Sequence, residues 1–341
     1  MPRPQNDKSI KEEEFYLVNP SDTASILKNF KIIKKIAEYE FNHKGKKQRK
    51  NWYYDSSDII TNPLLIFGKI IPYSHNFIKD NREEEKKEKE HKENKDKYLN
   101  LVINEMEKLK QLDLVRKLKE RIEITIDKLG LKKEKITATN SWRMVIGLGG
   151  SHPQETSMIL HHIYGIPYIP ASALKGVTRH WAVQKFAEIL FKNKNENFDK
   201  CLEKISKSLE EGKDKDLDNL KIKIENKEIN FNELIKIFGT QKKEGKIIFF
   251  DAFPSEYIKL KIDIMNPHYP NYYSGKEPPA DWQSPNPIKF LTVEKTKFTF
   301  YLCIKKSEEK ELLEKAKILL EDSLKNYGIG AKTALGYGLF E

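Results

Sequence analysis

The stretch IPYIPASALKGVTRHW, residues 166–181, combines a predicted helix start with cationic side chains. Pro170 ends an extended run, and Ser172 is the predicted N-cap of the helix that follows. Ser172, Lys175 and Arg179 are spaced i, i+3 and i+7, so they share one helix face. Free amides at a helix start, with Lys and Arg along the first two turns, suit a phosphate group. The alternative is that Lys175 and Arg179 are ordinary solvated residues.

A second candidate is the glycine-rich segment GIGAKTALGYGLFE, residues 328–341. It is not a P-loop, because Ala331 separates Gly330 from Lys332, whereas a P-loop requires Gly-Lys-Ser/Thr at the start of a helix. Unshielded backbone amides next to a lysine can lie flat against a sugar-phosphate backbone. The alternative is a helix C-cap followed by a β-bulge. The residues predicted to contact a sugar-phosphate backbone here are Gly328, Gly330, Lys332, Thr333 and Tyr337.

Histidines in the segment after residue 150 raise the possibility of catalysis. His152, in GGSHPQETSM, is a candidate general base for a metal-independent ribonuclease, with Glu155 assisting. His161 and His162 lie nearby, and nothing in the sequence favours one of the three. A loop histidine is more often a surface or hydrogen-bonding residue.

Residues 265–288, MNPHYPNYYSGKEPPADWQSPNPI, are rich in proline and aromatic residues. This proline density excludes a helix or a central strand. The aromatic side chains can stack on bases or wedge between them, or they can pack the loop against its own body. The residues considered are His268, Tyr269, Tyr272, Tyr273, Lys276 and Trp282. Asp263, His268 and Asp281 are too irregularly spaced to predict a metal site, so no metal and no cofactor is expected.

Composition limits the function classes. The 341 residues carry a formal net charge of +11 and a pI of about 9.2, which favours a polyanionic partner such as nucleic acid. A Lys/Glu-rich surface of the thermophile type is the alternative. The two isolated cysteines, Cys201 and Cys303, do not form a thiolate zinc motif. No apolar run is long enough to span a membrane, and no secretory signal is recognisable, so a cytoplasmic protein is expected.

The N-terminal part, residues 1–134, is predicted to be helical. Residues 21–41 have apolar residues at helical spacing, and residues 99–130 show a long amphipathic pattern with a break near 111–113. Between them, residues 79–97 are almost wholly charged, as in a disordered loop or a solvated helix.

From residue 135 the pattern is strand, helix, two or three strands, helix, strand, with the last strand at 334–340. This β-α-β-β-α-β order predicts an α+β domain. Its sheet is expected to be antiparallel, with both helices on one face and the first and last strands as central neighbours. The predicted domain covers 135–341, with insertions at about 192–240 and 265–290.

The run GIPYIPASALKGVTRHW, followed far downstream by GIGAKTALGYG, resembles the RAMP superfamily of CRISPR-associated RNA-binding proteins. More narrowly, three segments resemble the family of the sixth subunit of the type III-B effector, the Cmr complex. They are IFGT…GKIIFFDAFP, the proline-rich segment extended through PNPIKFLTVEKTKF, and the terminal glycine loop. The resemblance covers about residues 141–181 and 237–341. Ala171 and Ala173 stand where many RAMPs have Gly and Ser.

The resemblance implies a ferredoxin-like (RRM-like) fold and a crRNA-binding subunit that caps a helical filament near the crRNA 3′ end. It implies crRNA, target RNA, the repeated backbone subunit and a second capping subunit as partners. The proline-rich segment would be a thumb that wedges into the guide–target duplex, with His268, Tyr269, Tyr272, Tyr273 and Lys276. In this family target cleavage is assigned to an Asp on a loop of the repeated backbone subunit. The loop GGSHPQET has no Asp, so a non-catalytic subunit is expected. A ribonuclease that processes precursor crRNA and a purely protein-binding cap are the alternatives.

Overall fold

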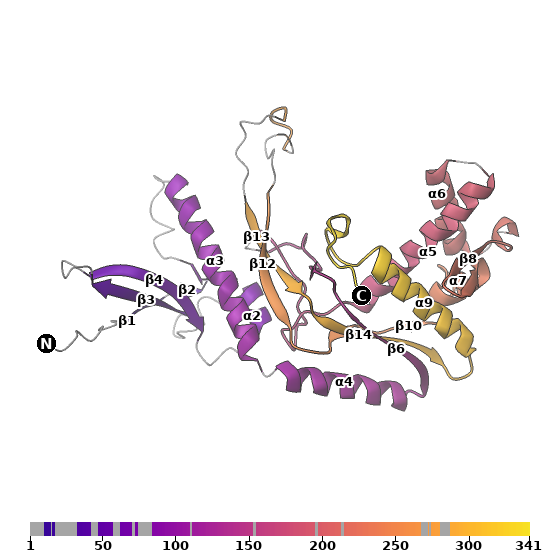
Figure 1. The fold of residues 1–341 in the computed structure, drawn as a ribbon, viewed down its shortest axis with the longest axis horizontal. Coiled ribbons are helices and arrows are strands. Elements are labelled where there is room, and N and C mark those ends of the chain that lie inside the picture. Colours follow the sequence, from indigo (N-terminus) through magenta and orange to yellow (C-terminus); the bar gives the residue numbers. More distant parts are fainter. Residues whose placement is uncertain are drawn as a thin grey trace. The chain divides into compact units, whose positions relative to one another are not determined.

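The computed structural model of the chain describes most of its length. The described residues are 10–14, 16–17, 33–41, 47–56, 62–69, 72–73, 84–109, 111–152, 155–194, 197–212, 215–266, 272, 274–279 and 287–341. The chain divides into two compact units. Figure 1 labels helices and strands of both. Unit 1 contains residues 1–110, 149–166 and 260–292, and unit 2 contains residues 111–148, 167–259 and 293–341. None of the described helices is both long and apolar enough to cross a membrane.

Unit 1 contains short antiparallel sheets and two helices. Its elements are β1 (Ile10–Glu14), β2 (Tyr16–Leu17), β3 (Ile33–Phe41), β4 (Lys47–Ser56), α2 (Pro63–Lys69), β5 (Pro72–Tyr73) and α3 (Glu84–Lys108), together with most of β12 (Lys259–Met265) and β13 (Ile288–Glu294). β3 lies between β1 and β4, and β2 pairs with β5. Tyr98 of α3 is fully buried, and its hydroxyl shares its proton between the carbonyls of Ile66 and Phe67 within α2. This buried tyrosine fixes α3 to α2.

The prediction of a helix over residues 21–41 is wrong for the described part, because residues 33–41 form strand β3. β3 is hydrogen-bonded to β4 from Ile33↔Ser56 to Phe41↔Lys47, and to β1 along its other edge. The next segment, which is basic and contains aromatic residues, forms strand β4. Over only nine residues, the spacing of Ile, Tyr and Phe is compatible with a helix or with a strand. Hydrogen bonding along both edges favours the strand.

Other N-terminal predictions are confirmed. The charged segment at 79–97 is helical from Glu84, as the solvated-helix alternative required. The helical pattern is interrupted between Lys108 and Gln111, close to the predicted break. α4 (Gln111–Lys128) ends just before Gly130, which has a φ of 64°.

Unit 2 is an antiparallel sheet with helices. Its elements are α4, β6 (Leu131–Thr139), β7 (Arg143–Met144), α5 (Ala171–Lys194), α6 (Phe198–Glu211), η2 (Lys215–Leu217), β8 (Lys221–Ile224), β9 (Lys227–Asn230), α7 (Phe231–Phe238), β10 (Ile248–Phe249), β11 (Phe253–Pro254), β14 (Lys297–Lys305), α9 (Lys310–Asn326) and η3 (Thr333–Leu335). β14 is the central strand and pairs with β6 on one side and with β10 and β11 on the other.

Helices cover both faces of this sheet. Tyr301 and Cys303 of β14 face α4, where they form a buried cluster with Ile126. Phe300 points to the other face and packs edge-on against Phe340, whose amide donates to Leu324 of α9. The predicted pair of helices, α5 and α9, contact each other. The helix α4 on the opposite face was not predicted as part of this domain.

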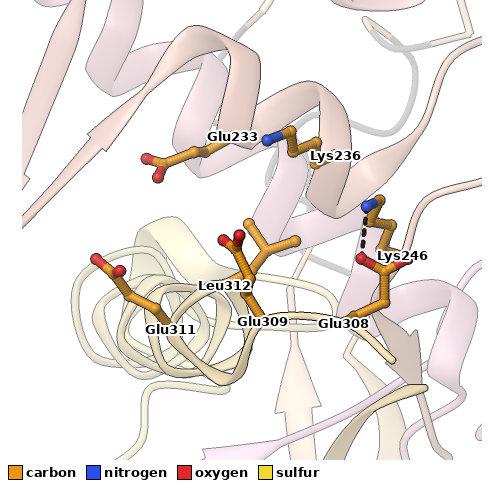
Figure 2. Close-up of a pocket in the computed structure, with 7 residues that line it drawn as sticks. All are labelled: Glu233, Lys236, Lys246, Glu308, Glu309, Glu311 and Leu312. Atoms are coloured by element: carbon orange, nitrogen blue, oxygen red, sulfur yellow. Dashed lines mark hydrogen bonds and ion pairs between the residues drawn. The ribbon is translucent and has the colours of Figure 1, made fainter. Parts of the chain in front are cut away.

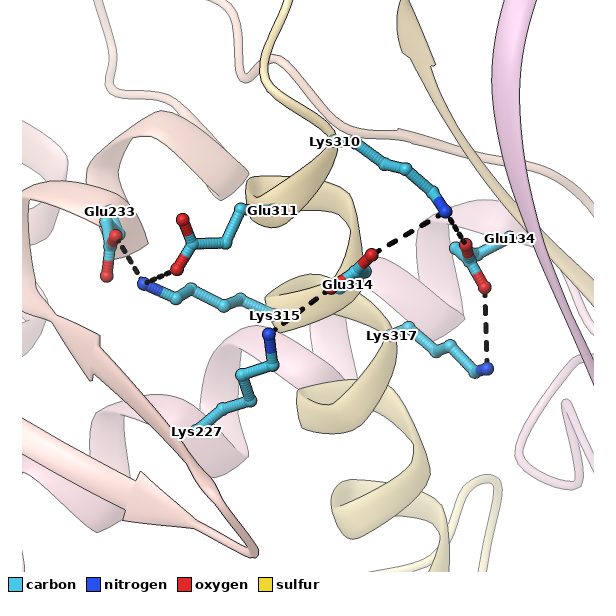
Figure 3. Close-up of polar contacts among 8 residues, drawn as sticks. All are labelled: Glu134, Lys227, Glu233, Lys310, Glu311, Glu314, Lys315 and Lys317. Carbon is cyan, nitrogen blue, oxygen red and sulfur yellow. Dashed lines mark hydrogen bonds and ion pairs between the residues drawn. The ribbon is translucent and has the colours of Figure 1, made fainter.

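The segment expected to be a poorly patterned insertion at 192–240 is folded. α6 buries Cys201, Ile205 and Leu209 at helical spacing, among the lysines and glutamates that obscure this pattern in the sequence. Figure 3 shows how α7 is fixed to α9: the Lys315 ammonium lies 2.7 Å from Glu233 and 3.1 Å from Glu311. Burial opposes the charge on Lys315, but these two hydrogen bonds outweigh it and raise the pKa of the ammonium.

The C-terminal segment does not form the predicted strand. Residues 333–335 form a 3₁₀ helix, and pairing is limited to an isolated bridge between Asn140 and Phe340. Thr139 and Glu341 still exchange two backbone hydrogen bonds of 2.9 Å. The end of the chain therefore lies beside the end of β6, as expected, but it forms no strand. The prediction that the first and last strands are the central neighbours is wrong, because β14 occupies the centre of the sheet.

Candidate nucleic-acid interface

The start of α5 is capped by a residue that the sequence did not indicate. The helix begins at Ala171, and the Ala171 amide donates to Asp251 Oδ1 at 2.7 Å. Ser172 lies inside the first turn with an exposed side chain, so its prediction as the N-cap is wrong. Asp251 thus occupies part of the positive helix end predicted to receive a phosphate.

We expect Asp251→Ala to lower the free energy of unfolding by about 1 kcal/mol, because it removes the acceptor for a helix-start amide. Asp251→Asn retains a side chain of the same length with an acceptor oxygen, so it should retain most of that stability. Urea unfolding of both variants measures the difference. Equal losses of stability in the two variants would show that the side-chain oxygen of residue 251 does not cap the helix.

The two cations of the predicted α5 face have different surroundings. Lys175 is half-buried, and no hydrogen bond or ion pair to its side chain is found among the described residues. Arg179 donates to Glu210 Oε1 at 3.1 Å and to the Ser206 carbonyl at 3.5 Å, both on α6. Lys175 is therefore the more available cation on this face.

The glycine-rich segment forms a closed loop. The Ile329 amide donates to the Gly338 carbonyl at 2.9 Å, which joins the two ends of the loop. The Ala331 amide donates to Val145, and the Gly338 amide donates to Arg143, so the loop is anchored on the strand β7 segment. At Gly330 a Cβ atom would lie 2.4 Å from the Val145 carbonyl oxygen, so glycine is required for this close approach.

The residues inside the closed loop are the ones predicted to bind RNA. Lys332 has a φ of 62°, Thr333 begins η3, and Leu335 is 67% exposed at its tip. Tyr337 is buried, at 5% exposure, and its ring packs 4.8 Å from that of Trp142 at an angle of 56°. The exposed ring of this pair is therefore Trp142, not the predicted Tyr337.

The loop and α5 meet through one aromatic residue. Tyr327 precedes the first loop glycine, and its ring lies 5.2 Å from His180 and 5.9 Å from Trp181 of α5. Trp181 in turn donates from Nε1 to Asp322 of α9 at 2.6 Å. The glycine loop therefore begins against the helix that carries Lys175.

The candidate catalytic histidines have structural contacts within unit 1. His152 Nε2 lies 2.8 Å from the Phe67 carbonyl oxygen, so this nitrogen carries a proton, and the ring stacks on Phe67 at 4.3 Å. Burial lowers the pKa of His152. Glu155 pairs with Lys95 at 3.0 Å.

The other two histidines form an aromatic stack. His161 lies between His162 and Tyr164, at centroid distances of 4.8 and 4.6 Å, and its Nδ1 accepts from the Ile163 amide. Its Nδ1 is therefore engaged in a local turn.

The predicted thumb lies largely outside the described residues. His268, Tyr269, Tyr273 and Trp282 fall there, as does Asp281. Tyr272 and Lys276 are described, and both are exposed. No group of three metal-ligating side chains occurs in the described part of the chain, and Asp263 accepts from the neighbouring Ile264 amide.

A small pocket opens between α7 and α9 (Figure 2). It is lined by Glu233, Lys236, Lys246, Glu308, Glu309, Glu311 and Leu312. Lys246 lies 2.5 Å from Glu308 and holds the pKa of that carboxyl below its usual value. The lining of this pocket contains more glutamates than lysines, so the pocket does not suit a phosphate backbone.

A family model of the RAMP superfamily matches residues 135–341. The chain belongs to the RAMP superfamily. The match begins within β6 and includes α5 and the glycine loop, so the RAMP region contains all eight residues predicted to bind RNA.

Two curated relatives bear the name Cmr6. The Cmr6 subunit of the CRISPR system Cmr of Pyrococcus furiosus is 43% identical over 222 residues, which are 58% of this RAMP protein and 64% of that relative. This chain therefore spans just under two thirds of the length of that relative. The Cmr6 subunit of Saccharolobus solfataricus is 25% identical over 288 residues, 82% of this chain and 80% of that protein. The narrower resemblance drawn from the sequence is thereby confirmed.

A solved structure shares the fold. A chain of the type III-B Cmr-beta complex, determined by cryo-EM with cognate target RNA bound, matches with a TM-score of 0.51 and 22% identity, over 78% of each chain. At this identity the match supports a RAMP-type fold of mixed helices and antiparallel strands.

Two residues near the predicted site were not singled out from the sequence. Trp142 is followed directly by Arg143, and an aromatic–cation pair at the end of a strand is a signal that could have been used. Asp251 is a lone carboxylate within the apolar run IIFFDAF, where an acid requires a specific partner.

Proposed function

We propose that this protein is a non-catalytic, crRNA-binding subunit of a type III-B CRISPR effector that caps its filament of RAMP subunits. Its partners would be crRNA, target RNA, the repeated backbone subunit and a second capping subunit. The two relatives named Cmr6 support the assignment to the complex.

We infer the RNA-binding role from the closed glycine loop. It presents Lys332 and Thr333 on a backbone anchored by short hydrogen bonds to β7, and it starts against α5, the helix with Lys175. An anchored loop loses little entropy on binding, and the two lysines can neutralise phosphates. The amides of Ile329, Ala331 and Gly338 are already hydrogen-bonded within the protein, so the cations are the proposed phosphate contacts.

The absence of catalysis is part of this proposal. The contact of His152 Nε2 with a carbonyl leaves only its Nδ1 as a possible base, and Glu155 is paired with Lys95. We further propose that unit 2 is a ferredoxin-like variant, in which the C-terminal bridge to Asn140 takes the place of the last strand.

We expect the double variant Lys175→Ala/Lys332→Ala to bind single-stranded repeat RNA about tenfold more weakly at moderate salt, because two phosphate contacts are lost. The slope of log K against log salt should fall by about 1.4, at about 0.7 per phosphate of a single strand. Fluorescence anisotropy with end-labelled RNA over a salt series measures both quantities.

The matched control is Lys223→Ala/Lys243→Ala, which removes the same charge from two exposed positions elsewhere in unit 2. It should leave the slope unchanged. Equal slopes for both double variants would mean that net charge, not this surface, attracts RNA. If the protein cleaves repeat RNA without metal and His152→Ala abolishes this cleavage, the alternative function, a ribonuclease that processes precursor crRNA, would be established instead.

A further inference from the structure

Trp142 is an exposed aromatic residue within the RAMP region. It lies in the turn between β6 and β7, and its side chain is 43% exposed. Leu335, at the tip of the glycine loop, is 67% exposed. Single exposed apolar residues are common on protein surfaces, so the surroundings of this ring must indicate its role.

The backbone of Trp142 is held rigidly. Its carbonyl accepts from Asn140 Nδ2 at 3.0 Å and from the Lys295 amide at 3.0 Å. Its ring rests on the buried Tyr337, with centroids 4.8 Å apart. The exposed ring is thus positioned before any partner binds, which reduces the entropy lost on binding.

One cationic side chain lies next to the ring, and two lysines are joined to the same segment through their backbone. The Arg143 guanidinium carbon lies 5.4 Å from the ring centroid of Trp142. Lys295 is hydrogen-bonded to Trp142 through its backbone, and the Lys332 carbonyl accepts from the Tyr337 amide. Glu294, 3.5 Å from Arg143 Nε, offsets one of these three charges. An exposed aromatic face next to cationic residues suits a ligand that combines a planar ring with a negative charge. A nucleotide has both, in its base and its phosphate.

We propose that Trp142 stacks on one unpaired base of the bound RNA, while Arg143, Lys295 and Lys332 contact the flanking phosphates. The proposal rests on the RNA-binding function above and assigns a base-stacking position to it. Stacking is tolerant of sequence, since every base has an aromatic face. Trp142 would therefore add affinity without selecting a particular nucleotide.

Stacking and phosphate contacts differ in their dependence on salt, and this difference provides the test. We expect Trp142→Leu, which keeps apolar bulk but cannot stack, to weaken binding of a labelled single-stranded RNA about tenfold. The slope of log K against log salt should stay at the wild-type value, because no phosphate contact is removed. Trp142→Phe retains an aromatic face and should bind within about threefold of wild type.

Tryptophan fluorescence gives a second readout. Unlabelled RNA should quench part of the emission of the full-length wild-type chain, and that part should be missing in Trp142→Phe. Thermal unfolding of both variants shows whether the contact with Tyr337 is needed for folding, and the Phe variant preserves the test if the Leu variant does not fold.

The outcomes separate this inference from the proposed function. Wild-type affinity in Trp142→Leu, together with weakened binding in Lys175→Ala/Lys332→Ala, would overturn the stacking role alone. Wild-type affinity in both would overturn the proposed function as well. Loss of assembly with other subunits at unchanged RNA affinity would assign Trp142 to a protein contact and overturn the stacking role.

Discussion

Replacing Gly338 with alanine is expected to lower the free energy of unfolding by about 3 kcal/mol. Gly338 has a φ of 68°, and an added Cβ would lie 1.9 Å from the Ile329 carbonyl oxygen. The residue is also fixed in place, because its amide donates to Arg143 at 2.7 Å and its carbonyl accepts from Ile329 at 2.9 Å. The chain cannot move away from the clash without breaking the closure of the glycine loop.

Gly336 provides the matched control, since it has a φ of 89° but an added Cβ would meet no heavy atom within 4 Å. Gly336→Ala should cost only the left-handed backbone penalty, about 1 kcal/mol. Urea unfolding of both variants separates the steric contribution from the backbone contribution. If the two alanine variants lost the same stability, the close approach of Gly338 to Ile329 would not matter.

Replacing Asn140 with alanine should also cost about 3 kcal/mol. Asn140 is fully buried just after β6, and its side-chain Nδ2 donates to the carbonyls of Trp142 and Val293. Its side-chain oxygen accepts from the Thr296 amide at 2.7 Å. Alanine would remove three hydrogen bonds to buried backbone groups, at about 1 kcal/mol for each bond. The Trp142 carbonyl would retain only the Lys295 amide as a partner.

Asn232→Ala is the control for this substitution, because Asn232 is exposed and makes a long 3.3 Å contact with Asp218. Its stability should change by no more than about 0.5 kcal/mol. Asn140→Ala should also shift the emission of Trp142, whose carbonyl it holds. If Asn140→Ala lost less stability than Asn232→Ala, water would replace the Asn140 side chain at no cost in free energy.

The sequence was sufficient for features that depend on neighbouring residues. The start of helix α5 and the break between α3 and α4 were predicted close to their observed positions. Helical hydrogen bonds, caps by glycine and apolar periodicity act over a few residues, so they are visible in a single sequence. The net positive charge, the glycine-rich segment and the RAMP resemblance were equally accessible.

Other features were determined only by the tertiary structure. Residues 33–41 became a strand because β1 and β4 pair with both of its edges, and α5 is capped by Asp251, 80 positions along the chain. The glycine loop closes on β7, which buries Tyr337 and leaves Trp142 exposed. Each of these depends on a partner distant in sequence, and no local pattern encodes which distant residue supplies a hydrogen bond or covers a ring.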